Sequence, residues 1–317
     1  MLEKKDKTVV LLIPCVVFLF LFLTGTMTSG YHFVDDHEVI RMKVDLKSST
    51  LIDVTKKWVH EDLVSNNRFR PLYYIHRVFE AELFGSNFFQ WSLYAGTQCC
   101  IALIFFYLGI RNMKLLPGES ILFQIIVFLG PQSAIWWKLG PSEGLAIFFF
   151  SLSFYFMSKS LEGKNYILNN VLFIFFLILS SLCKESFVLI IPGFLFFKLW
   201  HEKNNLWLNL KETLTKNLIL LILVIVLVTE LVIIKYYVGT NYSGLKSDLT
   251  DNLKGFFATG MHFLRSYLNI IIVGVILFVI NLFRKKIIFR IDPFSLIFFF
   301  LIITPNIIVL DRLRIDF

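Results

Sequence analysis

The 317-residue chain is long enough for one or two soluble domains, but its composition excludes a water-soluble fold. Hydrophobic residues make up 56% of it, 36 residues are phenylalanine, and the mean hydropathy is +0.71. Lys and Arg outnumber Asp and Glu by 31 to 23, and they lie in short segments between apolar runs. Basic residues placed in this way indicate membrane topology rather than a nucleic-acid partner.

Nine apolar runs come close to the length that crosses a bilayer, roughly 17 to 22 residues. They cover residues 9–27, 91–110, 120–137, 143–158, 166–182, 187–200, 216–236, 263–283 and 293–310. The first run is too long for a typical signal peptide and no A-x-A-like site follows it, so we expect a retained helix. The sequence predicts an all-α integral membrane protein with about nine transmembrane helices in a single domain, 1–317.

The orientation follows from the basic residues between the predicted spans. With the N-terminus inside, the cytoplasmic connections hold Arg111, Lys114, Lys159, Lys164, Lys198, Lys203, Lys211, Lys216, Arg284, Lys285, Lys286 and Arg290. The short outward turns hold far fewer, chiefly Lys138 and Lys184. The positive-inside rule therefore predicts a cytoplasmic N-terminus.

Residues 28–90 form the one predicted outward segment that is too long to be a connector, and they hold four of the six histidines. Apolar residues recur at helical spacing after Pro71, at Leu72, Ile75, Phe79 and Leu83, and Gly85 is placed to end this helix. A weaker pattern runs through Leu51, Val54, Trp58 and Val59. We expect two amphipathic helices on the membrane surface that wall an outward cavity.

The four cysteines, Cys15, Cys99, Cys100 and Cys183, lie in or beside apolar runs without metal-ligand spacing. We expect them to be small buried hydrophobic residues.

The first candidate site is the acidic motif Asp35-Asp36-His37-Glu38, which follows the first predicted span. Adjacent carboxylates at a low-dielectric boundary raise one another's pKa, so Asp35 or Asp36 is a candidate proton acceptor. A capping box that uses Asp35 and Glu38 is the structural alternative, and both roles can coexist. These oxygen and nitrogen groups also suit a divalent metal, although their spacing is nonspecific.

Three further candidates carry charge close to the membrane. Arg68 and Arg70 precede a helix N-terminus, which suits phosphate binding, with snorkelling toward lipid headgroups as the alternative. Lys184 and Glu185 lie in a tight outward turn, where a plain salt bridge is the alternative. Glu143 follows an aromatic belt at Trp136 and Trp137 and is an acid that can face the cavity.

The order of the motifs along the chain resembles that of the GT-C superfamily of membrane glycosyltransferases. A first helix is followed by the acidic motif, by Arg-x-Arg-Pro-Leu before an amphipathic helix that ends Leu-Phe-Gly, and by the Lys-Glu turn. The likeness spans most of residues 1–200 and is closest to bacterial members and to the protein O-mannosyltransferase-like branch. It implies a polyprenyl-phosphate sugar donor and inverting transfer of a hexosyl or pentosyl group. The acceptor that the resemblance implies is an envelope polysaccharide, lipid or protein on the outer side of the bacterial cytoplasmic membrane.

The resemblance also implies roles for individual residues. Asp35 or Asp36 is the expected general base; Arg68, Arg70 and Lys184 are expected at the phosphate. His37, Glu38, Glu143 and Glu185 are the remaining candidates for substrate contacts. The end of the chain, Asp311 to Phe317, departs from the family, whose members often continue with further helices. A C-terminally shortened product is therefore an expectation, and it puts activity in question more than fold.

A membrane transporter or lipid-glycan flippase is the alternative from a different class. It predicts ionisable residues in the middle of spans and helices interrupted by Gly or Pro. The clearest charged motifs instead lie at the outer ends of predicted spans, with Glu230 as the exception. This placement favours the enzyme.

Overall fold

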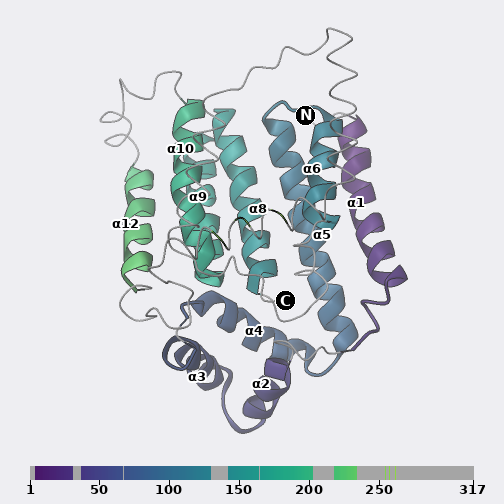
Figure 1. The fold of residues 1–317 in the computed structure, drawn as a ribbon, viewed down its shortest axis with the longest axis vertical. Coiled ribbons are helices and arrows are strands. Elements are labelled where there is room, and N and C mark those ends of the chain that lie inside the picture. The colour runs from purple at the N-terminus through teal and green to yellow at the C-terminus, as the bar shows by residue number, and fades with distance from the viewer. Residues whose placement is uncertain are drawn as a thin grey trace.

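The computed structural model describes residues 4–30, 37–66, 68–129, 142–163, 165–202 and 218–233, with Lys254, Phe257 and Met261. Within these residues the chain is all-helical, as predicted. Upright helices form a bundle, and the helices that lie between residues 37 and 84 form a layer at one end of it (Figure 1).

The elements are α1 (Lys4–Leu23), α2 (His37–Ser48), α3 (Leu51–Val64), α4 (Pro71–Phe84), α5 (Phe88–Asn112), α6 (Pro117–Leu129), α8 (Ser142–Leu161), α9 (Tyr166–Cys183), η2 (Glu185–Ile190), α10 (Ile191–Glu202) and α12 (Leu218–Ile233). By length and composition, α1, α5, α8 and α9 can cross a membrane. These four apolar helices indicate a membrane protein. The count of nine spans stays a prediction, because 263–283 and 293–310 lie outside the described residues. The described parts of α6, α10 and α12 are also shorter than a full crossing.

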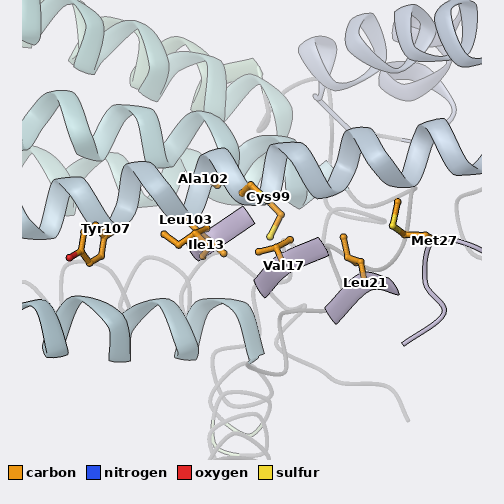
Figure 2. Close-up of a cluster of buried hydrophobic side chains, with 9 residues drawn as sticks. Ile13, Val17, Leu21, Met27, Cys99, Ala102, Leu103 and Tyr107 are labelled. Carbon is orange, nitrogen blue, oxygen red and sulfur yellow. The ribbon is translucent and has the colours of Figure 1, made fainter. Parts of the chain in front are cut away.

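Helix α1 packs on α5 through one face only. Ile13, Val17 and Leu21 follow one another at four-residue intervals and lie along α5 beside Cys99 and Leu103 (Figure 2). Helix α5 carries Gly96 at this contact, and a Cβ there would come within 2.7 Å of the Leu21 side chain. The helices are therefore held close by a small residue, as is common in membranes.

A buried ion pair joins the N-terminal end of α1 to the C-terminal end of α5. Asp6 accepts hydrogen bonds from Arg111 Nε at 2.7 Å and from the Tyr107 hydroxyl at 2.8 Å. The opposite face of α1 is exposed, and the expectation that all four cysteines are buried is wrong for Cys15 for this reason. The other three cysteines are buried and free.

Helix α8 lies between α5 and α9 and forms the centre of the bundle. Gly109 on α5 admits the Phe154 ring of α8. On the other side, Ser153 donates to the Phe173 carbonyl at 2.9 Å, and Ser180 donates to the Ala146 carbonyl at 2.8 Å. Small residues and hydroxyl groups that bond across helices allow this close packing in an apolar environment.

Helices α2, α3 and α4 form the layer at one end of the bundle (Figure 1). The amphipathic helix expected after Pro71 is confirmed as α4, which ends at Gly85 with a positive φ of 54°. The weaker pattern is confirmed as α3, which Thr50 caps by accepting from the Asp53 N–H. Buried aromatic residues, among them Trp58, hold the layer together.

Two faces of α4 have different surroundings. Leu72 packs against the ends of α8 and α9, whereas Ile75, Phe79 and Leu83 form an exposed apolar stripe. The His76 Nε2 atom lies 2.8 Å from the Tyr94 hydroxyl, which ties α4 to α5. Helix α4 is therefore fixed against the bundle while one apolar stripe stays uncovered by the described residues. Contact of this stripe with lipid remains a prediction.

Candidate functional site

Charged residues from both the α2–α4 layer and the bundle meet where the two parts are in contact. Arg70 is the N-cap residue of α4, and Glu143 lies in the first turn of α8. Lys184 separates α9 from η2, and Glu185 begins η2. These residues, with Asp62, Tyr74 and Glu38, are called the charged cluster below.

Arg70 is held by a partner that the sequence did not indicate. Its Nη2 donates to Asp62 Oδ1 at 2.6 Å and its Nε donates to Oδ2 at 3.3 Å. The Asp62 side chain is 2% exposed and that of Arg70 10%. Burial alone would lower the pKa of Arg70, but the hydrogen bonds and charge of Asp62 outweigh it and raise the pKa above its ordinary value. Arg70 is therefore a fixed, enclosed cation and not an exposed snorkelling side chain.

Tyr74 extends this ion pair to α2. Its hydroxyl accepts from Arg70 Nη2 at 3.3 Å and donates to Glu38 Oε1 at 3.1 Å. Burial raises the pKa of Tyr74 well above its ordinary value despite the nearby Arg70. The hydrogen bond from this hydroxyl keeps Glu38 in the cluster. The rings of Tyr73 and Tyr74 also contact the Arg70 guanidinium, each at 5.4 Å.

A second ion pair joins α8 to the end of α9. Lys184 Nζ lies 2.7 Å from Glu143 Oε1. The pair is more open than the first, because the Lys184 side chain is 17% exposed and that of Glu143 35%. The charge of Arg70 is close enough to act on Glu143. The two ion pairs therefore belong to one electrostatic unit.

Glu185 ties η2 to the segment that precedes α4. Its Oε1 accepts from the Phe69 backbone N–H at 3.2 Å, and the Phe69 ring packs on Val188. Its charge also acts on Arg70. Glu185 thus holds the segment that precedes α4 against the bundle.

Five of the residues predicted from sequence come together here: Glu38, Arg70, Glu143, Lys184 and Glu185. His37 is exposed at the start of α2, and the Arg68 backbone N–H donates to the Asp62 carbonyl at 3.0 Å. Asp35 and Asp36 lie outside the described residues, so their roles as base or helix cap stay predictions.

The metal hypothesis also stays a prediction. Across the described residues, no three His, Cys, Asp or Glu side chains are grouped to hold a metal ion. Asp35 and Asp36 lie outside these residues.

An apolar cavity of about 650 Å³ lies along the bundle between α6 and α10. Ile190, the last residue of η2, lines it together with Phe150 and Phe194. Its polar lining residue, Glu119, accepts from the Leu116 backbone N–H at 2.8 Å. The volume is within the range of ligand pockets in proteins, and the lining suits a hydrocarbon chain. Element η2 thus has the charged cluster at one end and this cavity at the other.

The fold and the cluster together define a helical membrane protein with paired charges at one end of its bundle. Comparisons with protein-family models, with curated proteins and with solved structures find no match to the chain. The chemistry of the cluster therefore has to follow from its own geometry.

Proposed function

We propose that the chain is a GT-C-type glycosyltransferase that moves a sugar from a polyprenyl-phosphate donor to an envelope polysaccharide, lipid or protein. The reaction takes place on the outer face of a bacterial cytoplasmic membrane, with the N-terminus inside and residues 28–90 outside. One observation carries this proposal: Arg70 from the first loop meets Glu143, Lys184 and Glu185 from the bundle at a single cluster.

The proposed reaction needs three contributions from the protein. A carboxylate, Asp35 or Asp36, takes the proton of the acceptor hydroxyl. The oxygen of this hydroxyl then attacks the anomeric carbon of the sugar, with inversion. The bond from this carbon to the phosphate oxygen breaks, and the phosphate leaves with the electron pair. Because phosphate is already a good leaving group, the protein mainly positions the reactants and stabilises the developing charge.

We assign different roles to Arg70 and Lys184, the two described cations of the cluster. Arg70 already donates from Nε and Nη2 to Asp62 and from Nη2 to Tyr74, so in this proposal it contributes a fixed positive field rather than a direct bidentate phosphate contact. Lys184, the more accessible of the two, is the direct phosphate ligand. In this proposal Glu143 and Glu185 accept hydrogen bonds from sugar hydroxyls, and the apolar cavity beyond η2 holds the lipid tail.

The test uses membranes that contain the protein and labelled polyprenyl-phosphate sugars. At least one of the variants Asp35→Asn and Asp36→Asn is expected to lower sugar transfer by about 100-fold or more, as loss of a general base does. Asp45→Asn is the matched control, since Asp45 pairs with Lys57 within the α2–α4 layer. Wild-type transfer by both test variants would exclude these carboxylates as the base.

The flippase alternative has one observation in its favour. Glu230 on α12 is 4% exposed, and its Oε1 accepts from Ser181 at 2.9 Å. Among the described residues, its Oε2 has no hydrogen-bond partner. An ionisable group within a bundle is typical of transport pathways. In proteoliposomes a flippase would move the lipid-linked sugar across the bilayer intact, and Glu230→Gln would stop it. Transfer to an acceptor without this movement supports the enzyme.

A further inference from the structure

The two ion pairs of the charged cluster differ in how accessible they are to a ligand. Asp62 fills two donors of Arg70, and both side chains are almost enclosed. Lys184 contacts one oxygen of Glu143, whose side chain is 35% exposed. An anion that enters the cluster can therefore reach Lys184 more readily than Arg70.

The charges of the cluster disfavour an added anion as long as both pairs stay closed. Four carboxylates, Asp62, Glu38, Glu143 and Glu185, accompany the cations Arg70 and Lys184. A phosphate that bound Lys184 beside Glu143 would place two anions on one ammonium group, and like charges at contact distance repel strongly in a partly buried site. Phosphate and Glu143 therefore compete for Lys184.

We propose that Glu143 is a resident counter-ion, which holds Lys184 while the site is empty and releases it to the phosphate of a lipid-linked ligand. The inference rests on the proposed function. An ammonium group on a flexible stem can exchange one oxygen partner for another, whereas the Arg70 fork is fixed by two bonds. Glu143 is accordingly a positioning residue for Lys184.

The exchange gives the site a way to distinguish the donor from its spent lipid. Once released, the Glu143 carboxylate can accept hydrogen bonds from sugar hydroxyls. A donor with its sugar satisfies both Lys184 and Glu143, whereas polyprenyl phosphate without sugar satisfies only Lys184. The spent lipid is therefore bound more weakly, and the ion pair closes again as it leaves.

The experiment measures binding of sugar-free polyprenyl phosphate to the full chain in lipid nanodiscs. Glu143→Gln keeps the shape of the side chain and removes the competing charge, so the affinity should rise by about tenfold, the effect of one partly screened charge. Lys184→Met should abolish the binding. Glu162→Gln is the matched control, because Glu162 pairs with Lys159 at 3.1 Å beside the opposite end of α8, and it should change nothing.

Two further ligands identify what the lysine recognises. Polyprenol, which lacks the phosphate, should bind equally to wild type and Glu143→Gln. Inorganic phosphate should compete only weakly, because it lacks the tail. A gain for polyprenol as large as that for polyprenyl phosphate would overturn the exchange, and so would competition by inorganic phosphate at equal affinity.

Unchanged or weaker binding by Glu143→Gln overturns the inference. Glu143→Ala, which also frees Lys184, must show the same direction of change, and a thermal unfolding curve shows that each variant is folded. Sugar transfer is measured separately. If the protein transfers sugar but Glu143→Gln does not change the binding, only this inference is wrong. If Glu143→Gln raises the affinity but the protein transfers no sugar, the proposed glycosyltransferase activity is wrong.

Discussion

Asp62 and Asp45 each pair with one basic residue in the α2–α4 layer, but they differ in burial. Asp62 and Arg70 are 2% and 10% exposed, whereas the partners Asp45 and Lys57 are 22% and 52% exposed. A buried ion pair is costly to break from one side, because the remaining charge has lost both its partner and its water. An exposed pair contributes little, because water replaces the partner.

Asp62→Asn is therefore expected to destabilise the fold by about 3–5 kcal/mol, and Asp45→Asn by no more than about 1 kcal/mol. Thermal unfolding in detergent can be followed with a thiol-reactive dye in a Cys15→Ser background, which removes the exposed thiol. Cys99, Cys100 and Cys183 are buried in the folded chain and react once they are exposed. Equal shifts for the two variants would contradict the enclosed state of Arg70.

The sequence could not predict this ion pair, although both residues are adjacent to recognised patterns. Asp62 lies in the last turn of α3 and reads as an ordinary polar residue of an amphipathic helix. Its contact with Arg70 depends on how α3 and α4 pack on each other, which local propensity does not determine. The Lys184–Glu143 contact likewise joins residues 41 positions apart and requires the packing of α8 on α9.

At the scale of elements, sequence patterns succeeded where a local rule acts. Pro71 and Gly85 mark both ends of α4, because proline suits a first helical turn and glycine tolerates positive φ. The predicted run at 187–200 differs from the structure, in which η2 precedes α10 and the helical geometry changes at Ile191. Pro192 explains the change, because it has no N–H to continue the preceding turn.

The packing of α5 on α8 gives an element-scale prediction. A Cβ at Gly109 would lie 2.6 Å from a Phe154 ring carbon, so Gly109→Ala is expected to destabilise the fold by about 1–3 kcal/mol. Gly118 in α6 has nothing within 4 Å of such a Cβ, and Gly118→Ala should be neutral or slightly stabilising. The same thermal assay compares them, and a stable Gly109→Ala protein would show that the two helices are less tightly packed.

At the scale of the molecule, the charged cluster and the Asp6–Arg111 pair lie toward opposite ends of the bundle, since α5 runs from the α2–α4 layer to Arg111 (Figure 1). The sequence predicted that these charged residues lie at different ends, because charged segments alternate with apolar runs along the chain. The composition alone could not predict which loop residues fold back onto the bundle. The Phe69–Glu185 hydrogen bond supplies that link, and it exists only once α9 and η2 are in place.

The proposed outward orientation predicts which end of the molecule is accessible from outside the cell. Two exposed residues mark the two ends: Lys56 on α3 lies in the α2–α4 layer, and Glu162 beyond α8 lies at the opposite end of the bundle. In a Cys15→Ser background, an impermeant thiol reagent should label Lys56→Cys on intact spheroplasts, and Glu162→Cys only after permeabilisation. This order follows because the basic connections stay on the cytoplasmic side. The reverse order would place the charged cluster inside, where a donor presented at the outer face cannot reach Lys184.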